Sequence, residues 1–540
     1  MENAGTLLAA SLVVPLIGAA LILLLAGQRR EWAARLALAT TLLTLLLAGV
    51  VVFGYSPDEG LEYAVVDQTW LGAQTGLDVR LSVGLDGLGL WFYGLSALLM
   101  VTSVLVSWEA IRDRAGTFYA MLLLLETGML GVFVARDIIL FYVFFEFTLI
   151  PLFFLIGIWG SEQRRYAAMK FFLFTLAGSV LTFLGLLSIV LWHFWQPGSA
   201  GLTFSIPELT AAVGRQPMPL VWQYWVFAAL FVGFAIKVPL FPFHTWLPLA
   251  HVQAPTAGSV LLAGVLLKIG TYGFARFNLP LLPDATAALA PWLLWISVAG
   301  IIYGALVALA QSDIKRLIAY SSVSHLGFCM LGLFALNRLG TQGGVLQAVN
   351  HGLSTGALFA IVGMIYERYH TRRIADLGGI AVQVPVLAFC MVFFTFSSIG
   401  LPGLNGFAGE LLLLLGMFQR AWQTAMAGGG WQLMVIAVLA VSGVVLGAWY
   451  MLWLVQRVFF GPLKQPSNAG DDQQGVQDLS YREVFALAPL AVFVLWIGIQ
   501  PKFFLDRMAP SLSGVAAAAE ESWELNSQDV RVAVRDDSRH

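Results

Sequence analysis

The sequence predicts an all-α polytopic membrane protein with about fourteen transmembrane helices, and three observations support this fold class. First, 59% of the 540 residues are hydrophobic and only 11% are charged, against about 25% charged residues in soluble globular chains. Second, the mean hydropathy is +0.81. Third, the apolar residues form continuous runs rather than the alternating segments of a membrane β-barrel. A net charge of −2 also excludes the usual basic nucleic-acid binder.

Each predicted span contains roughly 20 apolar residues, the length that crosses a bilayer as a helix. The spans lie at approximately 5–27, 32–54, 84–108, 117–135, 138–160, 166–195, 220–248, 256–277, 286–310, 315–337, 342–366, 381–418, 430–460 and 483–504. They divide the chain into residues 1–110 with spans one to three, 117–277 with spans four to eight, 286–460 with spans nine to thirteen, 461–507 with a linker and the last span, and a polar tail at 508–540. We expect no soluble domain and a mobile tail.

Positive charges predict the orientation of these spans. The first span begins after the acidic Glu2 and is followed by Arg29 and Arg30, so it is unlike a cleavable signal and its start should face outside. With that orientation, Lys and Arg concentrate in the loops of the inside face, as the positive-inside rule requires. We therefore expect an integral protein of a bacterial plasma (inner) membrane with both termini on the outside face.

Several ionisable side chains lie within the predicted spans, where each costs roughly 2.5–3.5 kcal/mol to insert. They are Glu126, Glu146, Lys237, His244, Lys268, His325, His351 and Glu410. Lys268 and Glu410 have no obvious partner nearby in sequence. Because protonatable groups inside a helical bundle are typical of proton paths, the series predicts proton transfer through the membrane.

Some of these groups also fit structural roles. Glu126 and Lys170 lie nearer to span ends, which favours a snorkelling or interface role. His351 fits a hydrogen-bonded core histidine equally well. Glu146 and Lys237 could form one static ion pair between two helices, although a buried pair is weak evidence for stability.

Two of the spans, the seventh and the twelfth, contain residues that break helices. These residues are Pro239, Pro242 and Pro248 in the seventh span and Gly400, Pro402, Gly403, Gly406 and Gly409 in the twelfth. Broken helices are tolerated at membrane depth where protein or water satisfies the freed backbone groups. Their place beside intramembrane charges points to a transport site.

Spans four to eight and nine to thirteen resemble each other in order and spacing. Three pairs have similar separations along the chain: Glu146 and His325, Lys237 and Glu410, and Lys170 and His351. An odd number of helices per copy inverts the second copy, so the sequence predicts two inverted five-helix repeats. The match is imperfect, because the charge precedes the break in the seventh span and follows it in the twelfth.

Sequence motifs for cofactors and hydrolases give no support for other chemistry. The segment 352–356 matches G-x-S-x-G, but it lies within a span and follows no strand, so it predicts helix packing. Cys329 and Cys390 lie in different spans and form no C-x-x-C pair. The phosphate-binding and dinucleotide fingerprints are missing from the sequence. We therefore expect no metal and no redox cofactor in this chain.

Four segments resemble the antiporter-like membrane subunits of respiratory complex I. They are FFEFTLIPLFFLIGIWG at 144–160, FAIKVPLFPFHTWLPLAHVQAPTAGSVLLAGVLLKIGTYGFAR at 234–276, QSDIKRLIAYSSVSHLGF at 311–328 and LPGLNGFAGE at 401–410. The resemblance extends from about residue 84 to 504. Glu410 makes it similar to the chain M, or subunit 4, branch of that family, since the chain L and chain N branches typically carry lysine there.

This resemblance implies a set of roles. The glutamate and lysine that form a coupled pair in the family correspond to Glu146 and Lys237, and its central lysine and terminal glutamate correspond to Lys268 and Glu410. Three histidines fall at positions of the hydrated axis that links them: His244, His325 and His351. The chain would translocate a proton when quinone is reduced, with NADH, flavin, iron–sulfur clusters and quinone bound in other subunits, and with chain L-like and chain N-like neighbours.

Two other interpretations stay open at this point. A subunit of a multisubunit cation/proton antiporter or of a membrane-bound hydrogenase shares the same motifs. A structural scaffold with inert buried pairs is of a different class, and it predicts unchanged pumping after Lys268 and Glu410 are neutralised together.

Overall fold

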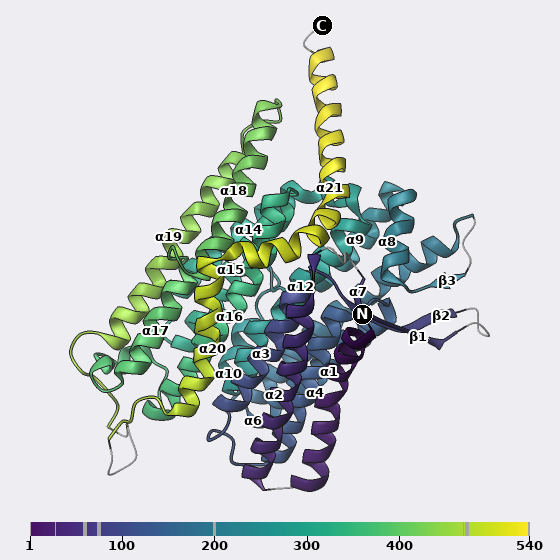
Figure 1. Cartoon of the computed structure of the whole chain (residues 1–540). Coiled ribbons are helices and arrows are strands. Elements are labelled where there is room, and N and C mark those ends of the chain that lie inside the picture. Colours follow the sequence, from purple (N-terminus) through teal and green to yellow (C-terminus); the bar gives the residue numbers. More distant parts are fainter. Residues whose placement is uncertain are drawn as a thin grey trace.

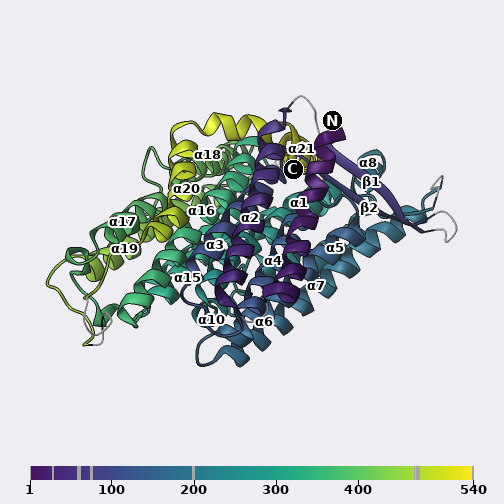
Figure 2. The same cartoon turned by 60° about the horizontal axis from the view of Figure 1, so that its bottom comes forward.

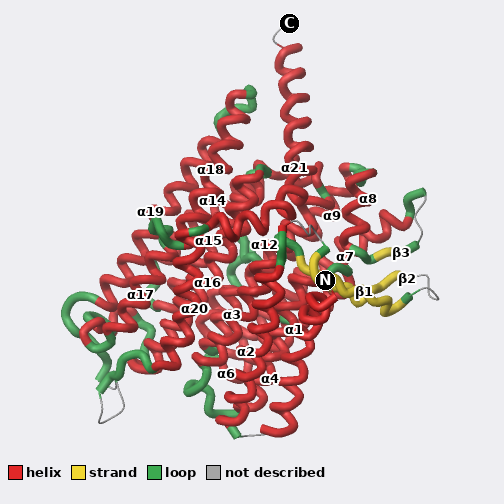
Figure 3. The backbone as a smooth tube through the Cα atoms, viewed as in Figure 1, coloured by secondary structure: helices red, strands yellow, loops and turns green. Residues whose placement is uncertain are grey.

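The computed structural model is a body of long helices packed side by side (Figures 1 and 2). It describes residues 2–26, 29–57, 62–72, 77–197, 201–467, 469 and 475–537, with side-chain surroundings up to Leu525. Helices dominate these residues, and the strands gather at one edge (Figure 3). An integral membrane protein follows from the length and apolar character of the helices.

The helices that correspond to the predicted spans occur in the predicted order. They are α1 (Glu2–Leu21) continued by η1 (Ile22–Ala26), α2 (Arg30–Gly54), α3 (Leu90–Val106), α4 (Ala115–Val134), α5 (Ile138–Phe147) with α6 (Leu149–Trp159), α7 (Arg164–Phe194), α9 (Leu220–Lys237) with α10 (Leu247–Gln253), α11 (Thr256–Leu261) with η3 (Leu262–Leu266), α12 (Leu267–Gly273), η4 (Phe274–Asn278) and α13 (Leu279–Leu281), α14 (Pro283–Leu309), α15 (Ile314–Phe334), α16 (Arg338–Tyr369), α17 (Pro385–Ser398) with α18 (Asn405–Met426), α19 (Gln432–Phe459) and α20 (Tyr481–Ile499). Short 3₁₀ turns follow α16 at η5 (Ile374–Asp376) and η6 (Ile380–Val382).

Twelve helices of the described chain are long and apolar enough to cross a membrane. The two other predicted spans differ in length. The third span is the 17-residue α3, and the twelfth is divided into the 14-residue α17 and the 22-residue α18. The inverted relation between the two predicted repeats, and the five-part division of the chain, stay predictions.

Both predicted helix breaks are present. The helix of the seventh span stops at Lys237 and resumes as α10 at Leu247. Between them the indole Nε1 of Trp246 donates to the carbonyl of Ile236 at 3.0 Å, so a side chain satisfies a backbone group that the break frees. The twelfth span breaks between α17 and α18, where Gly400 (φ +74°) and Gly403 (φ +92°) adopt left-handed backbone that favours glycine.

The chain is mostly helical, as predicted, and the loop after the second span adds strands that were not predicted. Strands β1 (Tyr63–Leu71) and β2 (Leu77–Leu85) pair antiparallel, and the short β3 (Leu202–Thr203) pairs parallel with β2. The hairpin projects from the edge of the helical body, near α5, α7 and α8 (Ile206–Arg215) (Figure 2). Its outer strand surface carries the ion pairs of Arg80 with Asp67 and Asp78, each at 2.9 Å.

The segment that was expected to be a polar tail forms most of the helix α21, which extends over Pro501–Asp537. Its first part lies across one end of the bundle before the helix turns away toward the C-terminus (Figure 1). Ser511 Oγ accepts from the backbone N–H of Gly87 at 2.8 Å, and Ser522 Oγ donates to Asp284 at 2.7 Å. Residues 538–540 of the predicted tail lie outside the described residues.

The chain begins and ends at the same end of the bundle. The start of α1 packs against β1, and α21 contacts Gly87 next to β2. The segments predicted to be inside loops gather at the opposite end, where residues near 110, 160, 255, 370 and 480 line one cavity. This arrangement agrees with an even number of crossings.

Candidate functional site

Four of the predicted site residues form one continuous chain through the centre of the bundle. Lys268, His351, His325 and Glu410 come from α12, α16, α15 and α18, and all four are buried. Neighbouring side chains in this series touch or nearly touch. The structure thereby joins helices of the first predicted repeat to helices of the second.

Lys268 occupies the middle of a helix with irregular hydrogen bonding. The short α12 that carries it lies between the π-helical turns η3 and η4. Such turns leave backbone carbonyls displaced from the usual ladder, and Lys268 Nζ donates to one of them, the carbonyl of Ala263. Its other contact is His351 Nδ1 at 2.7 Å. The ammonium is fully buried and has neutral partners, an arrangement that favours exchange of its proton over a static role.

The two histidines, His351 and His325, continue this series of side chains from Lys268 toward Glu410. The ring centroids of His351 and His325 are 5.6 Å apart. His351 Nε2 has no hydrogen-bond partner within the part of the chain that the structure describes. His325 Nδ1 lies 3.7 Å from Glu410 Oε1, and its Nε2 lies 3.3 Å from Ser398 Oγ and 3.4 Å from Tyr450 Oη. His325 therefore contacts the carboxylate on one side and hydroxyl groups on the other.

Glu410 sits directly against the break in the twelfth span. A Cβ on Gly400 would lie 2.5 Å from Glu410 Oε2, so the glycine leaves room for the carboxylate as well as allowing the turn. Gln347 Nε2 donates to Glu410 Oε1 at 3.1 Å. The break in the twelfth span thus positions Glu410, the last residue of this series of side chains.

A cluster of amides and hydroxyls beside Glu410 was not predicted from the sequence. Asn350 Nδ2 donates to the carbonyl of Asn405 at 2.7 Å, and Asn405 Nδ2 returns a bond to the carbonyl of Asn350 at 3.2 Å. Ser397 Oγ donates to Asn405 Oδ1 at 2.6 Å and lies 2.5 Å from Ser354 Oγ. These bonds hold α16, α17 and α18 together around the break. The sequence signal was the polar spacing of Gln347, Asn350 and Ser354 along one helix.

Glu146 and Lys237, the coupled pair that the resemblance implies, lie close together without a direct ion pair. Both are described, and no ion pair within 4.0 Å joins them in the described chain. Lys237 is buried, with Nζ 4.7 Å from the ring centroid of Phe145, the residue before Glu146. One oxygen of Glu146 is buried and has no hydrogen-bond partner among the residues described. The two charges are near enough to interact electrostatically but require a side-chain movement or water to meet.

His244 lies in the break of the seventh span and is separate from the central chain. Its ring packs against Phe241, Tyr303 and Tyr320, with centroid distances of 5.9, 5.0 and 6.3 Å. Its Nδ1 is buried without a hydrogen-bond partner in the described part of the protein. An aromatic pocket therefore holds the ring, and one nitrogen is free to take a proton.

Four other ionisable groups, Glu126, Lys170, Lys315 and His251, lie outside this series of side chains. Glu126 is fully buried at the middle of α4, and neither carboxylate oxygen has a partner among the described residues, so the interface interpretation is wrong for it. Lys170 is half-buried one turn and a half into α7, which agrees with that interpretation. Lys315, which begins the tenth predicted span and was counted among the cations of the inside face, is buried near the start of α15, and His251 in α10, which was not predicted as a site residue, is fully buried. The signal for His251 was its place three residues after Pro248 in the broken span.

The arrangement is suited to moving protons. Lysine, imidazole and carboxylate groups exchange protons without covalent change, and in this series Lys268 and His351 are within hydrogen-bond distance at 2.7 Å, while His325 and Glu410 are 3.7 Å apart. No group of three or more His, Cys, Asp or Glu side chains that could hold a metal ion occurs in the described residues. Cys329 and Cys390 are unpaired thiols. The expected lack of a cofactor stays a prediction.

The chain is similar to known membrane proteins over most of its length. Residues 135–444 match the family described as NADH:quinone oxidoreductase/Mrp antiporter, transmembrane. NADH-quinone oxidoreductase subunit M of Rhodobacter capsulatus is 40% identical over 498 residues, which cover 90% of each chain. NADH-ubiquinone oxidoreductase chain 4 of Arabidopsis thaliana is 38% identical, covering 93% of this chain and 96% of that one.

A solved structure shows the same fold. A chain of respiratory complex I from Thermus thermophilus with bound NADH superposes with a TM-score of 0.81 at 32% sequence identity. The match covers 95% of this chain and 99% of that chain.

Proposed function

This chain belongs to the NADH:quinone oxidoreductase/Mrp antiporter transmembrane family, as a membrane subunit of NADH-quinone oxidoreductase, and from this premise we propose which of its residues move protons. The path runs through Lys268, His351, His325 and Glu410. Their continuous contacts across four helices are the observation that carries the proposal. Proton transfer along them is coupled to quinone reduction elsewhere in the complex.

Glu146 and Lys237 act as the pair of groups that delivers a proton to this path. A carboxylate close to a lysine stabilises the charged ammonium, and its withdrawal in a dry site favours release of the proton. Because the two groups are separate here, a small movement of Glu146 changes the charge balance at Lys237. A field from a neighbouring subunit biases such a two-state pair. His244, in the break that follows Lys237, receives the proton next.

The surroundings of the chain follow from the same proposal. Its neighbours are chain L-like and chain N-like subunits of the membrane arm, and the membrane is a bacterial plasma membrane with both termini outside. NADH, flavin, iron–sulfur clusters and quinone bind in other subunits. Residues 117–277 and 286–460 act as two related halves, with Lys268 in the first half and Glu410 in the second.

A subunit of a cation/proton antiporter or of a membrane-bound hydrogenase is the second candidate function. The family description includes Mrp antiporters, and the fold alone does not separate these activities. The relatives at 38–40% identity have names of NADH:quinone oxidoreductase subunits, which favours the first function. Purification of the chain with its associated subunits separates the candidates, since flavin and iron–sulfur subunits that oxidise NADH are expected only for NADH:quinone oxidoreductase.

The direct test measures NADH-driven proton pumping by the whole complex in inside-out membrane vesicles. Lys268→Met and Glu410→Gln each remove one end of the path. We expect either variant to assemble, to retain NADH oxidation with an artificial acceptor, and to lose pumping severalfold. Wild-type pumping by both variants in an assembled complex would falsify the proposed path.

A further inference from the structure

An apolar groove lies between α2, α3, α16 and α20, and α21 borders one end of it. Leu45, Gly49 and Phe53 line the groove along α2, one residue for each turn. Because a helix rises 1.5 Å per residue, the groove follows α2 for about 12 Å. A bilayer has a hydrocarbon core of about 30 Å, so the groove spans most of one leaflet.

The groove exists because two glycines face it, Gly49 on α2 and Gly94 on α3. A Cβ added to Gly49 would have no atom within 4 Å, and a Cβ added to Gly94 would meet only Val52, at 3.4 Å. The floor is formed by Val349 and Leu353 of α16, whose side chains are 4% and 2% exposed. The helices therefore leave an open space above α16.

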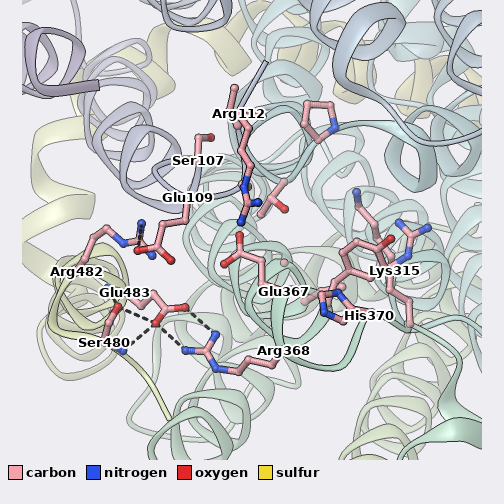
Figure 4. Close-up of a pocket in the computed structure, with 18 of the residues that line it drawn as sticks. Ser107, Glu109, Arg112, Lys315, Glu367, Arg368, His370, Ser480, Arg482 and Glu483 are labelled. Carbon is pink, nitrogen blue, oxygen red and sulfur yellow. Dashed lines mark hydrogen bonds and ion pairs between the residues drawn. The ribbon is translucent and has the colours of Figure 1, made fainter. Parts of the chain in front are cut away.

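Hydrogen bonds at the opposite ends of the wall helices hold this space open. Arg368 of α16 donates to Glu483 of α20 through two nitrogens, each at 2.8 Å, in the polar cavity where the predicted inside loops meet (Figure 4). Thr102 Oγ1 of α3 donates to the carbonyl of Ala486 in α20 at 3.0 Å. These bonds fix the position of α20 relative to α3 and α16, so the groove is part of the packed bundle.

The surface on both sides of the groove is apolar. Leu46 and Val50 of α2 and Val492 of α20 are each more than half exposed. A continuous apolar surface on membrane-spanning helices suits contact with acyl chains, and an apolar cavity binds apolar groups in preference to water.

Aromatic rings surround the groove at the end of the bundle where both termini lie. The ring centroids of Phe53 and Trp496 are 6.0 Å apart, those of Trp496 and Phe503 are 4.9 Å apart, and those of Trp91 and Phe503 are 6.0 Å apart. Phe53 and Trp91 also line the groove. Tryptophan is enriched where a membrane meets water, so this end of the groove is expected at the level of the lipid headgroups.

A positive charge lies at the same end. The guanidinium of Arg507 stacks on Phe503, with Cζ 3.7 Å from the ring centroid. Its Nη1 donates to the carbonyl of Phe503 at 3.2 Å, while Nε is buried and has no hydrogen-bond partner among the described residues. No ion pair in the described part of the chain includes Arg507. The planar guanidinium is suited to phosphate oxygens.

We propose that the groove binds a phospholipid of the leaflet on the side of both termini. One acyl chain lies between α2 and the floor of α16, and the phosphodiester lies against Arg507. An apolar groove as long as a leaflet, with a cation at its headgroup end, has the same order of apolar and charged parts as a phospholipid. This inference goes beyond the proposed function and does not rest on the proton path.

The test uses the whole complex, reconstituted in phosphatidylcholine vesicles with phosphatidylglycerol that carries a diazirine in one acyl chain. After illumination, mass spectrometry of peptides locates the attached lipid. We expect attachment at Val349 or Leu353, which bulk lipid does not reach because both are buried. A complex without lipid attached to this part of α16 overturns the proposal, whether the groove is empty or filled by a neighbouring subunit.

Gly49→Phe tests the groove itself. Its ring enters the open space at Gly49 and should lower lipid attachment to α16 severalfold. Val50→Phe is the matched control, because Val50 is the next residue of α2, is 52% exposed and does not line the groove. Attachment in Gly49→Phe at the wild-type level, or an equal loss in Val50→Phe, overturns the site.

The headgroup is tested with a diacylglycerol that carries the same diazirine chain and lacks the phosphate. The wild-type complex should attach phosphatidylglycerol severalfold more than this diacylglycerol at α16. Arg507→Gln should remove that preference. Arg215→Gln, which changes an exposed arginine at the end of α8, should retain it. Equal attachment of the two lipids in the wild type, or an unchanged preference in Arg507→Gln, overturns the assignment of the phosphate to Arg507.

Discussion

Lys268 Nζ and His351 Nδ1 lie 2.7 Å apart in the buried centre of the protein. At this distance one of the two nitrogens donates and the other accepts. A charged Lys268 therefore requires Nδ1 of His351 to be unprotonated. The pair holds one proton between two helices, which makes it a junction between the two halves of the chain.

The first prediction concerns this junction. His351→Leu and Lys268→Met each break the same contact, so their effects on pumping should not add, because residues in direct contact act as a unit. The double variant should pump at the rate of the worse single variant. Rates measured by dye quenching in vesicles, normalised to assembled complex, check this. Additive losses would show two independent paths.

Gly400 provides the second prediction. Gly400→Ala places a Cβ against Glu410 Oε2 and strains a residue at φ +74°, and strain of this kind costs about 1–3 kcal/mol. Pumping should fall because the carboxylate is displaced from His325.

Gly403→Ala is its control, since Gly403 has φ +92° but no atom within 4 Å of an added Cβ. The two variants should lose similar thermal stability, and only Gly400→Ala should lose pumping. Equal loss of pumping in both would mean that strain alone is responsible.

Glu146 and Lys237 give the third prediction. Glu146→Gln or Lys237→Ala should leave the complex assembled and lower pumping severalfold, since either change removes the charge that loads the path. Glu162→Gln, at an exposed loop position, is the control and should pump normally. Full pumping by both site variants in assembled complex would show that the pair is only structural.

The fourth prediction concerns stability and pH at Asp86, which precedes α3. Burial raises the pKa of Asp86, but the adjacent Arg276 and the N–H of Gly89 outweigh burial and hold it below its ordinary value. Arg276 Nη1 lies 2.7 Å from the carboxylate. Because the folded pKa is lowered, this stabilisation is complete above the ordinary pKa of about 3.9 and is lost only as the pH falls below it.

Asp86→Asn should accordingly lower the stability of the folded chain by about 3–5 kcal/mol at neutral pH, the usual effect of leaving a buried charge unpaired. Thermal denaturation of the purified complex measures this loss, which should shrink in acid. Glu31→Gln breaks the exposed pair with Arg35 and should cost about 0–1 kcal/mol. A loss in Asp86→Asn that is no larger than in Glu31→Gln would contradict the argument.

The sequence was informative where chemistry and helix breaking are local properties. Proline and glycine placed both breaks correctly, and the charges of Lys268 and Glu410 marked the ends of the buried chain. The sequence could not predict the contact between His351 and His325, because this contact depends on how α15 and α16 pack. The separation of Glu146 from Lys237 depends on side-chain packing around Phe145 in the same way.

Other features were misinterpreted because the polarity or charge of a segment was given more weight than a helical pattern also present in the sequence. The tail was interpreted as mobile from its polarity, yet Met508, Leu512, Val515 and Ala519 repeat with helical spacing and are buried against the bundle. Lys315 was counted among the cations of the inside face because a charged segment surrounds it. The π-helical turns at η3 and η4 have no sequence signature of their own.

Those two turns have a mechanical consequence for Lys268. A turn with i→i+5 bonding contains one more residue than an α-helical turn, and the surplus can move along the helix by exchanging one hydrogen bond at a time. When it moves, the residues it passes rotate about the helix axis while the ends stay anchored. Because η3 and η4 flank α12, we expect that a rotation of this short helix alone would change the direction of the Lys268 side chain without unfolding the segment.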